Sequence, residues 1–198
     1  MDTSDERLLV VVAHPDDETF GCGSLLAHAR AEGVTTFVAC ATRGEAGSPT
    51  PGRGLDDADM AEVRAAELHA AAELLGVDRV VLFDCADSDM EGEPAPGTLC
   101  AAPIDEVAER IAQVIAEPDS AHLDLGDLGT PDDLITTYLD TSDVLDVRER
   151  AMALHASQTP PNDVMPPDLR RDFLATDRLR RVVPPWEGGE RERALFAC

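Results

Sequence analysis

An α/β fold with a mostly parallel sheet and flanking helices is predicted by three observations on this 198-residue chain. Apolar runs of strand length alternate with helical segments up to residue 117. Segments rich in Gly and Pro, which mark loops, follow two of the apolar runs. Polar residues gather directly after these runs, at the carboxyl ends of the expected strands, where sheets of this kind place their sites.

The first elements follow from apolar patterning and from helix-end signals. Residues 7–13 contain the apolar run LLVVVA and are expected to form a buried strand. Residues 18–31 then form a helix that Gly33 ends. Residues 34–41 are a second apolar strand, and residues 42–54 are a Gly/Pro-rich loop.

The next elements repeat this order. Residues 56–77 predict a helix with Asp at its start and Gly76 near its end. Residues 79–83 are a third strand, and residues 103–117 are a helix with Pro103 suited to its first turn. Strands alternating with helices favour right-handed crossovers, so we expect a Rossmann-like, mostly parallel sheet.

The alternation breaks after residue 117, where an acidic, loop-like stretch begins. Residues 134–140 then predict a strand and residues 141–158 a capped helix, and the tail predicts a short helix and an edge strand. The break leaves open that one strand and its crossover are missing from the sheet. Because no repeat and no long linker divides the chain, we expect a single domain over residues 1–198.

Composition excludes several classes of partner. The net charge is −24, from 40 acidic and 16 basic residues, and every basic residue is Arg. Such a chain repels nucleic acid and anionic membranes, and its sign suits a cation or a neutral or cationic substrate. No apolar run approaches the ~20 residues of a membrane helix and no basic leader is seen, so we expect a cytoplasmic protein of open oligomeric state.

The strongest chemical signal lies directly after the first predicted strand. Asp16, Asp17 and Glu18 suit the start of a helix, but capping does not account for His14 and Pro15 before them. An imidazole nitrogen of His14 and a carboxylate oxygen of Asp17, three residues apart, can converge on one divalent cation, and this mixed donor set suits zinc. Asp16 is then free to accept a proton from water.

A phosphoryl-accepting receiver domain is a competing interpretation, because it also has an acidic pair after its first strand and an Asp after its third. Asp16, Asp17 and Asp84 match those places. Receiver domains also use a late Lys to hold the phosphoryl group, and this chain has no Lys. The sequence therefore favours the metal site.

Four segments resemble, in the right order, motifs of the PIG-L/LmbE-like N-acetylglucosaminyl deacetylases. They are AHPDDE at 13–18, TRGEAG at 42–47, RAAELHAAAELLGV at 64–77 and HASQ at 155–158. The resemblance covers most of the chain and implies a Rossmann-like zinc amidase. Such an enzyme would hydrolyse the acetamide of a small N-acetyl sugar conjugate whose second group the sequence leaves open.

The resemblance also implies roles for individual residues. By position, His14 and Asp17 would be zinc ligands and Asp16 the general base. His155 is expected to pack a helix against the core. The residues expected near the sugar-binding mouth are Arg64, Arg43 and Glu45.

One part of the family pattern is missing. A catalytic zinc normally has three protein ligands, and the family's third is a His in a G-H-x-D-H-like block after an apolar strand. Here residues 116–119 run directly into SAHLDLGDLG, and His122 is the only His nearby. Two functions stay open: a zinc-dependent deacetylase, or a degenerate, non-catalytic member that acts as a binding module.

Overall fold

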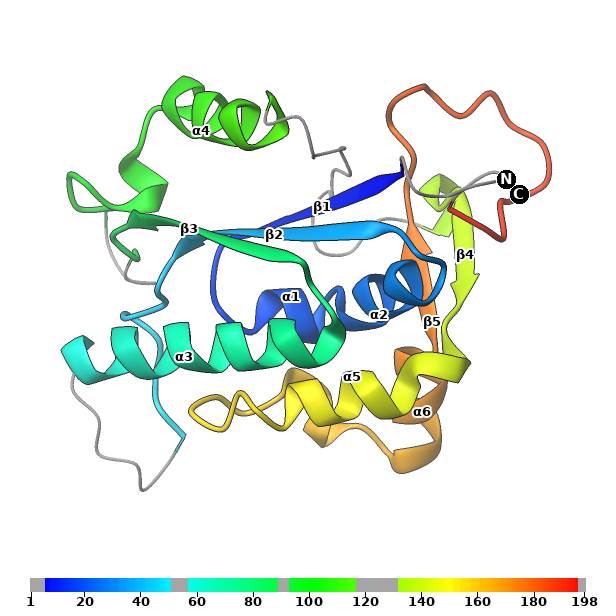
Figure 1. Ribbon diagram of the computed structural model, residues 1–198, viewed down its shortest axis with the longest axis horizontal. Coiled ribbons are helices and arrows are strands. Elements are labelled where there is room, and N and C mark those ends of the chain that lie inside the picture. Colours follow the sequence, from blue (N-terminus) through cyan, green and yellow to red (C-terminus); the bar gives the residue numbers. More distant parts are fainter. Residues whose placement is uncertain (1–5, 51–56, 89–92, 117–131, 196–198) are drawn as a thin grey trace.

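A three-stranded parallel sheet forms the centre of the protein, whose computed structural model describes residues 6–50, 57–88, 93–116 and 132–195. The strands are β1 (Arg7–Val12), β2 (Thr35–Thr42) and β3 (Arg79–Cys85), and they lie in the order β1-β2-β3 (Figure 1). Leu9 pairs with Phe37, and Ala39 pairs with Val81. The predicted mostly parallel sheet is confirmed.

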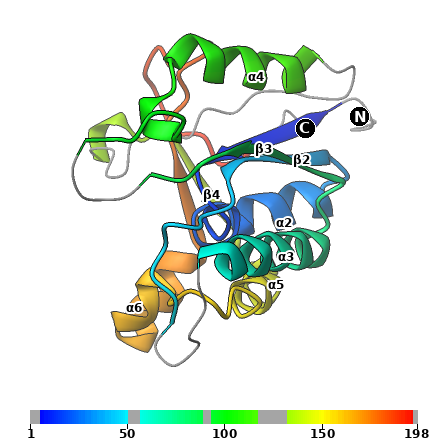
Figure 2. The same cartoon turned by 90° about the vertical axis from the view of Figure 1, so that its left-hand side faces the viewer.

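Helices cover both faces of this sheet. α1 (Asp17–Phe20), α2 (Gly23–Ala31), α3 (Asp57–Leu75) and α5 (Leu145–Met152) lie on one face, whereas α4 (Ile104–Ala116) lies on the other (Figures 1 and 2). The connections from β1 to β2 and from β2 to β3 run through the same helical layer, as expected when successive crossovers have the same hand. Helices on both faces also agree with the predicted fold class.

The later part of the chain adds a separate two-stranded sheet. β4 (Thr137–Asp140) and β5 (Thr176–Leu179) pair antiparallel, with Thr137 opposite Leu179. α6 (Pro167–Leu174) precedes β5. Short 3₁₀ helices occur at Leu99–Ala101, Asp132–Leu134, Ser142–Val144 and Pro161–Val164.

Two predicted helices differ from the observed ones. The helix expected over residues 18–31 is interrupted between α1 and α2, where Cys22 has φ −127°. The helix expected over residues 141–158 contains α5 but ends at Met152. Residues 155–158 instead form turns in which the His155 N–H bonds to the Met152 carbonyl and the Gln158 N–H to the His155 carbonyl.

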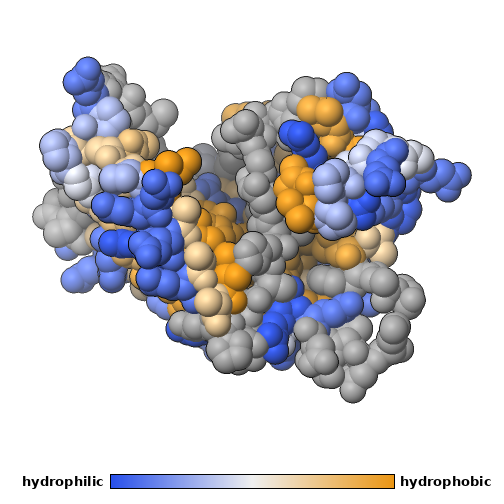
Figure 3. All heavy atoms as spheres, turned by 90° about the horizontal axis from the view of Figure 1, so that it is seen from above, coloured by the Kyte–Doolittle hydropathy of each residue, from blue (hydrophilic) through white to orange (hydrophobic). Residues whose placement is uncertain are grey.

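The hydrophobic core is larger on the face of the sheet that α2 and α3 cover than on the α4 face. Val10, Leu25, Leu26 and Leu68 are fully or almost fully buried there, and burial of such side chains stabilises the fold by about 1.5–3 kcal/mol each. On the α4 face a smaller cluster contains Leu9, Phe37, Ala39 and Val114, with neighbours such as Val81 and Phe83 only partly buried. Figure 3 views the molecule from above and shows apolar side chains open at the surface.

The prediction that one strand is missing after residue 117 falls on residues that the structure does not describe. The junction at residues 117–120 and His122 both lie in the segment 117–131, outside the described residues. Among the described strands, β1 pairs with β2 alone, so its other edge has no strand beside it. In the part of the chain that is described, no helix combines the length and apolarity needed to cross a membrane.

Candidate active site

The polar residues after β1, β2 and β3 meet at the carboxyl edge of the sheet. The Thr42 hydroxyl donates to the Ala13 carbonyl (2.9 Å) and accepts the Gly44 N–H (3.1 Å), so the loops after β1 and β2 are joined. The Asp87 N–H donates to Glu45 Oε1 (2.8 Å), which joins the loops after β2 and β3. This convergence is what parallel strands predict.

His14 and Asp17 face each other at this edge. The backbone N–H of His14 donates to Asp17 Oδ2 (3.0 Å), and His14 Nδ1 lies 3.5 Å from the same oxygen. Their side chains are 39% and 46% exposed. An imidazole nitrogen and a carboxylate oxygen are therefore adjacent and open to a ligand from solvent.

Asp87 holds the other side of the His14 ring. Its Oδ1 lies 3.1 Å from His14 Nε2, and its Oδ2 accepts the Ala46 N–H (3.2 Å). The side chain is 5% exposed. A carboxylate on Nε2 favours the tautomer that carries the proton there and leaves Nδ1, which faces Asp17, with its lone pair.

Asp87 was missed by the sequence analysis, which considered Asp84 as the acid after the third strand. Asp84 has a positive φ of 54° and accepts a hydrogen bond from Arg43 Nε (2.7 Å). These two side chains are 60% and 41% exposed and lie at the mouth of the edge. The signal that would have indicated Asp87 is its place after the end of β3, at Cys85.

Arg64 reaches the site from α3 and is buried. Its Nη2 donates to the Pro15 carbonyl (2.5 Å) and to Asp16 Oδ2 (3.2 Å), and its Nη1 donates to the Gly44 carbonyl (2.6 Å). The side chain is 5% exposed. A Cβ on Gly44 would lie 2.3 Å from Nη1, so the glycine leaves the space that the guanidinium occupies.

The predicted base, Asp16, is an acid with a perturbed pKa. Burial raises its pKa to about 6, against the opposing effect of the Arg64 guanidinium, and the neighbouring Asp17 charge raises it further. Burial also raises the pKa of Asp17, but hydrogen bonds from His14 outweigh it and the net shift is downward. The contact with Asp17 raises the pKa of His14, as does the charge of Asp87, against the effect of burial.

The His14 and Asp17 pair has the separation that a shared metal ion requires. Two donors at ~2.0–2.2 Å from one tetrahedral zinc lie about 3.4 Å apart, and Nδ1 and Oδ2 are 3.5 Å apart. The described residues contain no group of three or more His, Cys, Asp or Glu side chains arranged to hold a metal. They thus offer two donors that fit zinc, while the third stays unassigned.

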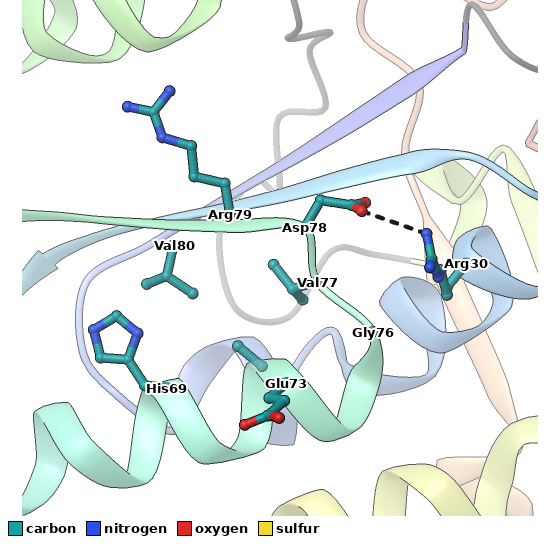
Figure 4. A pocket seen from close by; sticks show the side chains of 9 residues that line it. Arg30, His69, Glu73, Gly76, Val77, Asp78, Arg79 and Val80 are labelled. Carbon is teal, nitrogen blue, oxygen red and sulfur yellow. Dashed lines mark hydrogen bonds and ion pairs between the residues drawn. The ribbon is translucent and has the colours of Figure 1, made fainter.

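A cavity of the described residues lies away from this site. It has a volume of about 350 Å³ and is lined by residues of α3, the turn after it and the start of β3, among them His69, Gly76 and Val80 (Figure 4). Asp78 at its rim accepts the Thr36 N–H (2.9 Å) and pairs with Arg30 (3.4 Å). Since it opens at the amino end of β3, it is separate from the site at the carboxyl edge.

Comparisons with known proteins agree on one family. A model of the PIG-L family, described as GlcNAc-PI de-N-acetylase, matches residues 9–144. The 1D-myo-inositol 2-acetamido-2-deoxy-alpha-D-glucopyranoside deacetylase of Mycolicibacterium gilvum is 36% identical over 160 residues, which cover 70% of this chain and 54% of that protein. The chain spans about half, or less, of the length of the curated relatives it matches.

Two solved structures share the fold. The N,N'-diacetylchitobiose deacetylase of Pyrococcus horikoshii has a TM-score of 0.58 at 17% identity, with 88% of this chain and 83% of that chain covered. GalB, the 4-carboxy-2-hydroxymuconate hydratase of Pseudomonas putida, has a TM-score of 0.54 at 20% identity, with 85% and 82% covered. Because one is a deacetylase and the other a hydratase, the shared fold does not determine the reaction.

Proposed function

Because the chain belongs to the PIG-L family of GlcNAc-PI de-N-acetylases, we propose that it hydrolyses the acetamide of an N-acetylglucosamine-type conjugate with zinc as its cofactor. The observation that carries this proposal is the His14 and Asp17 pair, whose facing donor atoms are 3.5 Å apart at the carboxyl edge of the sheet. The deacetylase of Mycolicibacterium gilvum, similar over 70% of this chain, supports the same substrate class.

His14 and Asp17 would hold the zinc, and Asp87 would keep His14 Nδ1 turned toward it. When bound, zinc polarises an acetyl carbonyl and makes water more acidic, so that amide hydrolysis becomes accessible near pH 7. Asp16 would accept the proton of the attacking water as general base, which places its carboxylate in the catalytic role. With a pKa of about 6, the Asp16 carboxylate is a stronger base than that of an ordinary Asp, and it is still ionised near neutral pH.

Arg43 and Glu45 are proposed to contact the sugar from the loop after β2. Arg43 is half-exposed at the mouth, where its guanidinium is open to a hydroxyl-bearing ligand. Glu45 Oε2 has no hydrogen-bond partner among the described residues, although it is buried. Arg64 is the third residue predicted to bind substrate. Its guanidinium donates to Asp16 and to two backbone carbonyls, so we propose that it shapes the mouth of the site.

Release of free amine and acetate from a panel of N-acetylglucosamine conjugates, with and without added zinc, tests the proposed reaction. Zinc-stimulated turnover that chelation abolishes is the expected result. Binding of a conjugate with no acetate released would instead establish the non-catalytic binding module. Failure of both binding and turnover across the panel would refute the substrate class.

The assigned roles are tested by two substitutions that separate metal binding from proton transfer. Asp16→Asn should abolish turnover and leave zinc content largely intact, whereas His14→Ala should lose both. Equal loss of zinc in the two variants would show that the roles are misassigned.

Zinc measured by elemental analysis tests the third ligand. If the chain has no third protein ligand, a site with two protein donors binds zinc weakly, and well below one zinc per chain is expected after dialysis. One zinc per chain would require a third donor outside the described residues, and loss of that zinc in His122→Ala would identify it.

A further inference from the structure

The backbone of Asp16 has a conformation that side-chain-bearing residues rarely adopt. Its φ is 102° and its ψ is −30°. Conformations of this kind persist only where surrounding contacts hold them, and they cluster at functional sites. Whatever holds Asp16 in this conformation also determines where its carboxylate lies.

Glu18 supplies one such contact. Its Oε2 accepts the Asp16 backbone N–H at 2.9 Å. Glu18 is 0% exposed, so this acceptor works without competition from water. Hydrogen bonds to a buried carboxylate are stronger than those between neutral groups. The Glu18 carboxylate can therefore stabilise the strained backbone conformation of Asp16.

His155 holds Glu18 in turn. His155 Nε2 lies 2.7 Å from Glu18 Oε1, and the Thr19 hydroxyl donates to the same oxygen (2.5 Å). His155 is 1% exposed, its ring packs edge-on against Phe20, and its Nδ1 has no hydrogen-bond partner among the described residues. An Nε2–H donor and an unprotonated Nδ1 satisfy this arrangement best, since a buried N–H without an acceptor is costly.

We propose that Glu18 and His155 are positioning residues for Asp16. The buried carboxylate and imidazole hold the Asp16 backbone from the protein interior, while its carboxylate remains at the sheet edge beside Arg64. The expected packing of His155 against the core is thus only part of its role. This inference rests on the proposed function in one respect, namely that Asp16 is the general base.

A second contact between the same late segment and a helix provides a matched control. The Ser157 N–H and hydroxyl donate to the two carboxylate oxygens of Glu67 at 2.9 and 2.5 Å. Ser157 is 0% exposed and lies two positions after His155. This contact attaches the same turn to α3 but does not touch Asp16, so it reports the effect of loosening the segment alone.

The test compares Glu18→Gln, Glu18→Ala, His155→Phe and the control Ser157→Ala in the full chain. A misplacement of a catalytic group by about 1 Å can cost about 10²-fold in rate. We therefore expect kcat to fall about 10²-fold in Glu18→Ala and about tenfold in Glu18→Gln and His155→Phe, with KM and zinc content little changed. Ser157→Ala should lower the Tm and keep the wild-type kcat.

Crystal structures of the Glu18 variants provide a readout that does not depend on activity. Asp16 should leave its positive φ in Glu18→Ala. The proposal is overturned if Asp16 keeps this conformation and kcat is unchanged in folded variants, or if Ser157→Ala lowers kcat as much as Glu18→Gln.

The test also gives a result if a variant does not fold or if the wild-type chain is inactive. If Glu18→Ala does not fold, Glu18→Gln and His155→Phe provide the comparison. If the wild-type chain has no deacetylase activity, the proposed function fails, while the φ of Asp16 in the variants still decides whether Glu18 positions it.

Discussion

Replacing Arg64 by Met should destabilise the protein much more than the same change at Arg43. Both residues were predicted to lie near the substrate mouth, and both contact an Asp. Arg64 Nη2 is 3.2 Å from Asp16 Oδ2 with side chains 5% and 14% exposed, whereas Arg43 Nε is 2.7 Å from Asp84 Oδ1 with side chains 41% and 60% exposed. Burial, and not distance, separates the two pairs.

The magnitudes follow from this difference. Met at position 64 removes three hydrogen bonds and leaves two carbonyls and the Asp16 carboxylate without their buried donor. Breaking a buried ion pair by removing one partner costs about 3–5 kcal/mol, a large share of the ~5–15 kcal/mol of a typical domain. The exposed Arg43 pair contributes about 0–1 kcal/mol, because water and salt screen it.

Urea unfolding followed by circular dichroism measures both changes. With a slope of about 2 kcal/mol per M urea, a loss of about 4 kcal/mol lowers the midpoint by about 2 M. Arg43→Met should shift the midpoint by less than about 0.5 M. Equal shifts in the two variants would refute the inference that the Arg64 guanidinium is a buried structural link between α3 and the loops after β1 and β2.

Three further predictions concern other parts of the site and fold. Asp87→Ala should weaken zinc binding about 10- to 100-fold in a chelator competition, because His14 loses the carboxylate that orients its ring; unchanged affinity would exclude this role. Gly44→Ala should destabilise the chain by about 1–3 kcal/mol in the same urea assay, since φ is 68° and the new Cβ would lie 2.3 Å from Arg64 Nη1; a neutral effect would contradict the close approach. Asp177 lies in β5 and is buried. Burial raises its pKa to about 6, so its contribution to the free energy of unfolding is present below about pH 4 and is lost as pH rises through about 6. Asp177→Asn should therefore gain up to about 3 kcal/mol relative to wild type over that interval, and a constant difference across it would refute the shift.

Much of the central sheet could be predicted from sequence because its signals are local. The apolar run before His14 predicted β1 within one residue of its observed end, since a strand buried between helices needs apolar side chains on both faces. The position of His14 and Asp17 after that strand followed from the same pattern. Their metal-binding role stays a prediction.

The ends of the late helix could not be predicted this way. The sequence pattern predicts that the helix continues through residues 153–158, yet α5 ends at Met152 and these residues form turns. His155 and Ser157 instead reach the carboxylates of Glu18 and Glu67. The tertiary contacts with the buried Glu18 and the partly buried Glu67 outweigh local helix propensity here, and nothing in the local sequence reveals these contacts.

The residues that hold Asp16 explain why a short motif is an incomplete description of this site. Arg64 contacts Asp16 from 48 positions away, and His155 contacts Glu18 from 137 positions away. One contact engages the Asp16 carboxylate and the other, through Glu18, its backbone N–H. Since a base must be held close to its productive position to be effective, both α3 and the turn after α5 are needed for it. A chain that retained residues 13–18 but lost either partner would keep the motif without its geometry.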